Sequence, residues 1–491
     1  MTTIPNNPAA KTAEPYVKAF ARLEQAGPGR QPPWLLPLRK AGIARFAELG
    51  FPTLKHEDWR FTNVAPIAKL PFRPVLDAPF EEPNARQLDA RFGLPDARLL
   101  DTRAYRPYAV QRNWLPLTKP DAEQLGRLPL AKLSGPRFVF INGIYSPELS
   151  REAIAPDGVR IGSLADALVT DAALVEKHLG RYLRTEDNAF AALNNAFFQD
   201  GGFVFVSSGR ALAEPVHFLF VNTGKETGAA NHPRNLIIIE PGAKATVIES
   251  YVGIGDASAA TFTNAATEFL LGDGAVVEHC KLQDENPGAF HIAALHSRVG
   301  AAANFLAHSV AIGAKLSRNN IRTTLDGEGI EAVLNGVYLT GGEQLADHHM
   351  VVDHAKPNCA SHEYFNGILA GRSRGVFHGR ILVRPDAQKT DAKQTNKNLL
   401  LSDEASADAK PQLEIYADDV KCTHGATVGQ LNEESIYYLR SRGIGLEAAR
   451  RMLIHAFAGE IIDRVKHDGL REELDALVWD RLEQQSVVVG K

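Results

Sequence analysis

The chain has 491 residues, a formal net charge of −4 and a hydrophobic fraction of 44%, which are ordinary values for a globular protein with room for two or three domains. Its 54 lysines and arginines are spread along the chain and are outnumbered by 58 acidic residues, so the charge balance does not indicate a nucleic-acid-binding protein. The three cysteines are too scattered for a disulfide framework. The chain has no 18-residue apolar run and its N-terminus has no hydrophobic segment, so we expect a cytosolic protein without a membrane span or signal peptide.

The first part of the chain has helical periodicity. Apolar positions recur near helical spacing in residues 14–25 and 34–50, so we expect an amphipathic pair of helices that buries one face. Trp59, in the string KHEDWRFTN, is expected to anchor a packed corner. Residues 71–136 contain many prolines and indicate a small mixed α/β region. Residues 163–198 are predicted to be helical up to a Gln-Asp-Gly-Gly stop signal.

Strand-like sequence follows from residue 203 to residue 420. Apolar or alternating runs of about five to eight residues are separated by Gly, Asn, Asp or Pro, which predicts an all-β region. The pattern alone leaves a sandwich, a barrel and a β-solenoid open. The string GRSRG has the Gly-x-Ser-x-Gly spacing of a nucleophile elbow. That motif requires a helix after the serine, but the sequence that follows is strand-like, so Ser373 is expected in a turn. No P-loop is present, so the chain is not expected to hydrolyse ATP by itself.

Helices are predicted at the C-terminal end. Residues 433–442 follow Asn432, a good N-cap, and carry acidic residues in the first turn. A second helix is expected over residues 446–465, with a wide apolar face. Such a face fits the chain's own body or the groove of a partner equally well. Three residues on it lie four apart, namely Leu453, Phe457 and Ile461.

Cys422 and His424 lie two residues apart in the chain. Residues 412–420 read as a strand, and if that strand continues to residue 424 its period of two puts both side chains on one face. Their Cα atoms would then be about 6.6 Å apart. Two such groups supply half of a tetrahedral metal shell, so further ligands must come from elsewhere in the fold, a partner chain or water. A buried thiol beside a turn histidine is the structural alternative.

A second group of potential metal ligands lies in residues 345–369. Its weaker candidates are His348, Cys359 and His362. The sequence around them is strand-like, so the adjacent His348 and His349 should face opposite sides and are not expected to share a site. The alternative is that these residues form polar ladders between strands.

A longer string around Cys422 is more specific. PQLEIYADDVKCTHGATVGQLNEESIYYLRSRGI resembles the SufB/SufD family of iron-sulfur cluster assembly proteins, and within it the SufD branch. The resemblance continues upstream in RGVFHGRILVRPDAQKT and downstream in GLEAARRMLIHAFAGEII, and it is thinner in KHEDWRFTN and FVFINGIYSPELS. It implies a mainly β fold with α caps, in which a right-handed parallel β-helix core lies between an N-terminal helical region and a C-terminal helical domain.

The resemblance also implies a division of the chain. We expect an N-terminal helical or mixed region over residues 1–135 and a connecting α/β segment over residues 136–202. The β-helix core is expected over residues 203–430, and a C-terminal helical domain that binds the ATPase SufC over residues 431–491.

The function implied by the resemblance is that of a cytoplasmic scaffold subunit and not of an enzyme. Such a chain pairs with SufB through the β-helix cores and carries SufC on its C-terminal helices, here through Leu453, Phe457 and Ile461. Cys422, as thiolate, and His424, as neutral imidazole, would hold iron or a nascent iron-sulfur cluster transiently at the SufB interface, with no cofactor bound tightly by this chain alone.

Several alternatives stay open from the sequence. The isolated chain could form a homodimer, and no nucleic-acid or membrane partner is expected. The chain could be a purely structural partner of SufB without ligands. It could also be a β-solenoid enzyme that acts on a sugar or acyl substrate.

Overall fold

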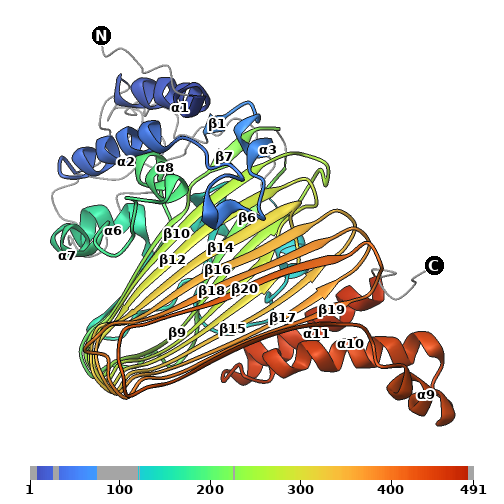
Figure 1. Ribbon diagram of the computed structural model, residues 1–491. Coiled ribbons are helices and arrows are strands. Elements are labelled where there is room, and N and C mark those ends of the chain that lie inside the picture. Colours follow the sequence, from blue (N-terminus) through green and yellow to red (C-terminus); the bar gives the residue numbers. More distant parts are fainter. Residues whose placement is uncertain (1–7, 26–31, 75–119, 121, 225–226, 485–491) are drawn as a thin grey trace.

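Two stacked β-sheets form the body of the protein, with helices packed on their outer faces (Figure 1). The computed structural model describes residues 8–25, 32–74, 120, 122–224 and 227–484. From β8 (Arg234–Ile239) onward consecutive strands alternate between the two sheets, so this part of the chain winds as a parallel β-solenoid. The predicted parallel β-helix core with helices toward both ends of the chain is confirmed.

The first sheet, sheet A, carries the even-numbered central strands. In spatial order it contains β20 (Ser406–Ile415), β18 (Arg374–Val383), β16 (Leu345–His354), β14 (Leu316–Leu325), β12 (Phe290–Val299), β10 (Phe262–Leu271), β8 (Arg234–Ile239), β5 (Gly202–Val206) and β4 (Val159–Ser163), with β7 (Ala229–Asn231) beside β10 and β1 (Arg73–Pro74) beside β7. At one end of the sheet β4 pairs antiparallel with β5, whereas at the other end β20 pairs parallel with β18.

The second sheet, sheet B, carries the odd-numbered central strands. In spatial order it contains β21 (Lys421–Gly429), β19 (Asp391–Leu400), β17 (Ala360–Leu369), β15 (Glu331–Thr340), β13 (Asn304–Ala311), β11 (Val276–Asp284), β9 (Lys244–Gly253), β6 (Val216–Asn222), β2 (Arg137–Ile141) and β3 (Ile144–Tyr145). Successive coils stack in register: Ala360 pairs with Asp391, which pairs with Lys421. A residue therefore lies directly above its counterpart one coil earlier.

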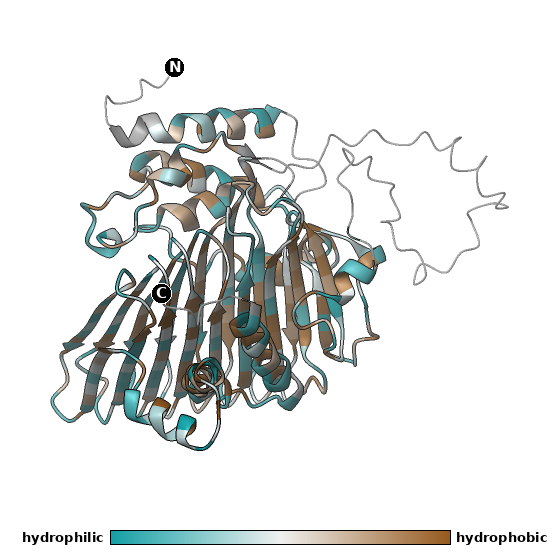
Figure 2. Ribbon diagram, turned by 90° about the vertical axis from the view of Figure 1, so that its right-hand side faces the viewer, coloured by the Kyte–Doolittle hydropathy of each residue, from teal (hydrophilic) through white to brown (hydrophobic). Residues whose placement is uncertain are grey.

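Apolar side chains fill much of the space between the sheets. The strands alternate between side chains that face this space, the lumen, and side chains that face outward, and Figure 2 shows hydrophobic and hydrophilic residues alternating along them. Burying each large apolar side chain contributes about 1.5–3 kcal/mol. The buried cluster includes Val204, Phe218, Ile237, Phe269, Phe305, Leu334, Phe365 and Phe377.

Helices from the N-terminal part of the chain cover the outer face of sheet A. They are α1 (Pro8–Gln25), α2 (Leu35–Leu49), α3 (Ala65–Ala68), α6 (Leu164–Thr170), α7 (Ala172–His178) and α8 (Ala189–Phe197), with short helices η1 (Glu57–Trp59), η2 (Pro147–Leu149) and α5 (Ala122–Gly126) nearby in sequence. The amphipathic pair α1 and α2 is confirmed, whereas the single helix predicted over residues 163–198 is wrong, because Asp171 ends α6 and a loop follows α7. Most of the region expected over residues 71–136 lies outside the described residues.

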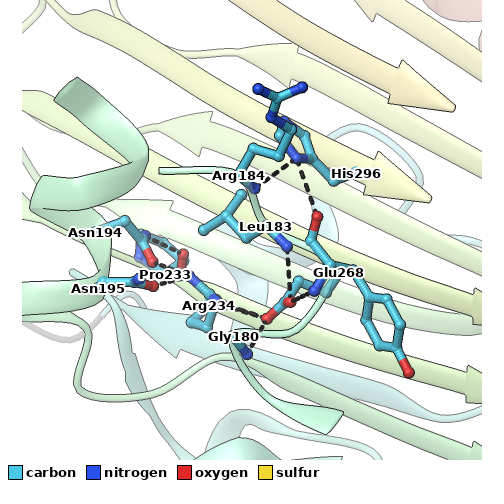
Figure 3. Close-up of polar contacts among 10 residues, drawn as sticks. Gly180, Leu183, Arg184, Asn194, Asn195, Pro233, Arg234, Glu268 and His296 are labelled. Carbon is cyan, nitrogen blue, oxygen red and sulfur yellow. Dashed lines mark hydrogen bonds and ion pairs between the residues drawn. The ribbon is translucent and has the colours of Figure 1, made fainter. Parts of the chain in front are cut away.

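A fully buried ion pair fixes the N-terminal helices to sheet A (Figure 3). Arg234 on β8 and Glu268 on β10 are 2.5 Å apart and have no exposed surface. The Glu268 carboxylate also accepts backbone N–H bonds from Gly180 and Leu183 at 2.8 and 2.9 Å, and the Arg234 guanidinium donates to Asn194 at 3.0 Å. A buried pair persists only when its remaining hydrogen-bonding capacity is filled in this way.

Helices from the C-terminal part cover the outer face of sheet B. They are α10 (Leu446–Ile462), which lies on β15 and β17, and α11 (Asp468–Gln484), while α9 (Glu433–Ser441) packs on α10. The predicted N-cap is confirmed, since Asn432 Oδ1 accepts from the N–H of Glu434 at 2.8 Å. Helix α11 was missed by the sequence analysis, although apolar residues four apart predict it, namely Leu470, Leu474, Val478 and Leu482. No described helix combines the length and the hydropathy needed to cross a lipid bilayer.

Candidate functional site at the end of the solenoid

The last coil of the solenoid brings Cys422 and His424 onto one strand. Strand β20 ends at Ile415, and residues 416–420 cross to the other sheet before β21 begins at Lys421. The strand predicted over residues 412–420 therefore ends at Ile415 and does not continue to residue 424, because each coil must turn to pass between the sheets. Both residues nevertheless lie within β21, so the period of two places them on the same face.

Both side chains face the lumen. Cys422 lies above Ala392 and His424 lies above Gln394 in the parallel register of β21 and β19, and Ala392 and Gln394 are buried between the sheets. The Cys422 side chain packs against a small apolar cluster that includes Ile381. The thiol and the imidazole therefore share the inner face of the terminal coil.

This end of the solenoid is uncovered within the described part of the chain. Cys422 is partly buried and His424 is exposed, whereas the residues one coil earlier are buried. Helix α10 lies on the outer face of sheet B and not across its end. Large apolar side chains of the last coil are left exposed, namely Ile415, Tyr416 and Val428. A surface of this kind is typical of an interaction site.

The surroundings of Cys422 keep its thiol protonated. Partial burial is the largest effect and raises the pKa of the Cys422 thiol; the Ala392 backbone N–H opposes it, and the Asp391 carboxylate adds the smallest effect, which again raises the pKa. Only the thiolate is a metal ligand. Binding of a cation at Cys422 must therefore displace a proton, which makes the affinity rise with pH.

Two polar residues below His424 were missed by the sequence analysis. Gln394 Nε2 lies 2.5 Å from Glu363 Oε2, in the lumen, and burial raises the pKa of Glu363 to about 8. Gly379 faces this amide, and a Cβ there would lie 2.3 Å from Gln394 Nε2, so the glycine leaves room for Gln394. The residues come from different coils, so only the register aligns them with His424.

The weaker metal candidates do not form one site. His348 is fully buried in the lumen, where its Nε2 lies 3.0 Å from the Ser309 hydroxyl. The Cys359 thiol is buried near the carbonyl oxygen of Gly327 at 3.1 Å. His362 is partly exposed at an outward position of β17. His348 therefore takes part in a polar contact across the lumen.

The position of Ser373, in the string GRSRG, is also defined. Ser373 is buried in the turn before β18, where its hydroxyl lies 3.0 Å from that of Thr340. Because a strand follows, the nucleophile-elbow geometry is absent there.

The predicted partner-binding residues on α10 have unequal access. Ile461 is buried in the cluster that joins α10 and α11 to sheet B. Leu453 and Phe457 are partly exposed and line a groove between α10 and the ends of β19 and β21. The carbonyl of Phe457 accepts from Asn366 on β17 at 2.8 Å, so the inner side of the helix is held by the chain itself.

Fold and site together define a β-solenoid protein with a thiol and an imidazole on the inner face of an end that the described residues leave uncovered. Residues 220–457 match the family described as "SUF system FeS cluster assembly, SufBD core domain", and residues 117–218 match "SufBD protein N-terminal region". The iron-sulfur cluster assembly protein SufD of Escherichia coli is 34% identical over 72% of this chain and 86% of its own length.

Other relatives agree with this assignment. An iron-sulfur cluster assembly SufBD family protein of Synechocystis is 34% identical over 69% of this chain and 76% of its own length. SufD of Bacillus subtilis is 27% identical over 67% of this chain and 75% of its own length. The chain belongs to the SufBD family of iron-sulfur cluster assembly proteins and is a homologue of SufD, as the motif around Cys422 predicted.

Proposed function

We propose that this protein is a scaffold subunit, and not an enzyme, of a complex with SufB and the ATPase SufC that assembles nascent iron-sulfur clusters. The observation that carries the proposal is the pair Cys422 and His424 on the inner face of an uncovered terminal coil. In this role the iron or nascent cluster is cargo, held transiently and shared with SufB. A thiol and an imidazole supply two ligands, and the facing subunit supplies the others.

The edge of β21 supports pairing with a second solenoid. An exposed edge strand offers unpaired N–H and C=O groups to a strand of another chain. Exposed Val428 and Tyr416 beside it would be covered by the partner. In this proposal residues 203–430 pair with SufB, while residues 1–135 and 136–202 form the N-terminal region and the connecting segment. A homodimer of the isolated chain would use the same edge.

The C-terminal helices supply a separate surface for SufC. Tyr437 and Tyr438 on α9 are 75% and 58% exposed, and Met452 on α10 is 42% exposed. Aromatic and methionine side chains are enriched at protein interfaces. We assign residues 431–491 to SufC binding, through this surface and the neighbouring Leu453 and Phe457, with Ile461 supporting the helix from inside.

The thiol chemistry of the site favours a reducing compartment. Cys280, Cys359 and Cys422 are all free, and two of them are buried. A thiolate that receives and releases iron must stay reduced to act as a ligand. We therefore propose that the protein works in the cytoplasm.

The test is to replace Cys422 and His424 by alanine, singly and together, in a complex co-produced with SufB and SufC. We expect the iron and acid-labile sulfide of the purified complex, and its visible absorption, to fall about tenfold or more, in the range of losses seen when metal sites are disrupted. Size-exclusion chromatography should show the complex intact. His362→Ala, on the outer face, is the matched control and should retain the cluster.

The same experiment tests the alternative that the chain has no ligand role. An unchanged cluster content in the double variant, with the complex intact, would mean that the chain is a purely structural partner of SufB.

A further inference from the structure

Three potential metal ligands meet on the outer face of sheet A, away from Cys422 and His424. Asp58, His349 and His378 each place a ligand atom within 4.8 Å of the other two. His349 Nε2 lies 3.7 Å from Asp58 Oδ1, and the two imidazole centroids are 4.2 Å apart. Among the described residues this is the one group of three such side chains that are close enough to share an ion.

The parallel register builds the histidine pair. His349 on β16 pairs with His378 on β18, so the two rings lie one above the other on neighbouring strands about 4.8 Å apart. Rigid strands of the solenoid core therefore position both rings. Because the adjacent His348 faces the lumen, His349 faces outward as the strand period requires.

The string KHEDWRFTN brings the third ligand to this face. Trp59 is buried against the Arg318 guanidinium, 3.8 Å from the ring centroid, and near Phe190. The Glu57 carboxylate contacts Lys410 on β20. These contacts on either side fix Asp58 above the two histidines, and its side chain remains 62% exposed, so it is free to rotate toward an ion.

Both imidazoles present lone pairs. Burial lowers the pKa of His349 well below its usual value, aided by neighbouring cations, and burial is also the largest effect that lowers the pKa of His378. His378 Nε2 lies 2.7 Å from Gln412 Oε1; a ring that donates from Nε2 offers Nδ1 to a metal, and such an outer hydrogen bond is typical of metal-ligating histidines. The buried Nδ1 of His349 has no hydrogen-bond partner.

The neighbouring cations are compensated. Arg318 is paired with Asp347 at 2.6 Å, and Lys410 is paired with Glu57. Arg380 lies 3.4 Å from Glu414. Asp58 is thus left as the carboxylate that faces the two neutral rings.

We propose that Asp58, His349 and His378 bind a divalent transition-metal ion, of the zinc and ferrous class, and thereby clamp residues 56–64 onto the solenoid. Two imidazoles and one carboxylate are a common ligand set for such ions. Bond lengths of about 2.1 Å require ligand atoms within about 4.2 Å of one another, which a rotation of the exposed Asp58 side chain supplies. Water fills the remaining positions.

The test measures Co²⁺ and Zn²⁺ binding to the full chain in a Cys422→Ala/His424→Ala background, so that the result does not depend on the proposed cluster site. We expect one equivalent of Co²⁺ with visible d–d absorption, displaced by Zn²⁺. Asp58→Asn, His349→Ala and His378→Ala should each weaken binding about tenfold or more, whereas His362→Ala should not. Zn²⁺ should also slow backbone hydrogen exchange in residues 56–64 of the background protein.

A histidine variant could lose metal binding because it misfolds. Asp58 is exposed, so Asp58→Asn should leave the metal-free melting temperature unchanged, and a loss of binding in this variant reports on the ligand itself. No Co²⁺ binding by the folded background protein, or binding that Asp58→Asn and His378→Ala leave unaltered, would overturn the proposal. Metal binding without altered exchange in residues 56–64 would refute the clamp.

Discussion

Buried ionisable side chains divide into those with charged partners and those without. Burial alone would raise the pKa of Glu268, but the Arg234 guanidinium and backbone N–H groups outweigh it and hold that pKa below its usual range. Glu363 has a neutral partner, Gln394, and burial raises its pKa to about 8. At neutral pH Glu268 is therefore a carboxylate, while Glu363 is mainly a carboxylic acid.

Glu363→Gln should change the pH dependence of stability. The folded-state pKa of Glu363 lies above its unfolded value of 4.5, so its contribution is fully present below about pH 4.5 and is lost as the pH rises toward 8. Relative to Glu363→Gln, the wild-type free energy of unfolding should fall by about 2 kcal/mol between pH 5 and pH 7. Urea titrations at both pH values measure this.

The control for this residue is Glu331→Gln, at an exposed position at the start of β15. Its effect should stay within about 0.5 kcal/mol at both pH values. Parallel pH profiles of the wild type and Glu363→Gln would show that Glu363 is ionised in the folded protein.

At the scale of elements, α10 and α11 have an inner face that belongs to the fold and an outer face that is free. The inner face packs into one cluster with sheet B, which contains Ile454, Ile461 and Leu474. The outer face and α9 expose Tyr437 and Met452. The wide apolar face predicted for α10 is therefore partly buried against the chain itself and partly exposed.

Leu474→Ala and Tyr437→Ala should separate these two roles. Leu474 is 1% exposed, so its truncation should cost about 2–5 kcal/mol of stability, which thermal or urea unfolding measures. Tyr437→Ala should leave stability within about 0.5 kcal/mol. It should instead weaken SufC binding, measured by calorimetry, by about tenfold, the size expected for an exposed aromatic anchor. Equal SufC affinity of Tyr437→Ala and wild type would remove α9 from the proposed interface.

At the scale of the whole molecule, the two strands at the open end differ as edges. The N–H of Ser406 donates to the Ser373 carbonyl in the preceding coil. Because the direction of the N–H groups alternates along a strand, the even-numbered residues of β20 face β18 and the odd-numbered residues, which include Pro411, face the free edge. Pro411 has no N–H to offer there, and prolines of this kind discourage strand addition. The N–H of Lys421 likewise bonds back to Thr390, which leaves the N–H groups of the even-numbered residues of β21 free.

Ala426→Pro should therefore block strand pairing without breaking the ladder between β21 and β19. The substitution removes an N–H that points to the free edge, so we expect the isolated chain to keep its circular dichroism spectrum and to melt within a few degrees of the wild type. Co-purification with SufB should be lost.

Thr427→Pro is the matched comparison for this edge. It removes an N–H that points to β19 and should lower the melting temperature of the isolated chain. Unaltered SufB co-purification by Ala426→Pro would exclude this edge as the interface.

Local sequence patterns determined most of the elements of this protein. Helical spacing located α1, α2 and α10, Asn432 located the start of α9, and runs of strand-forming residues located the β region, because these signals depend only on neighbours in the chain. Cys422 and His424 are two residues apart, so their spacing alone determined that both side chains lie on the same face if the two residues are in one strand. The kind of β architecture did not follow from the runs themselves and was indicated by the family resemblance.

Only the tertiary structure decided what lies next to these residues. The stacking of coils aligned His424 with Gln394 and His349 with His378, over separations at which sequence periodicity carries no signal. It also decided which end of the solenoid is left uncovered and that Asp58, far away in the chain, lies above two histidines. Contacts of this kind depend on the register between coils, and the register is fixed by packing across the whole solenoid and not by any single segment.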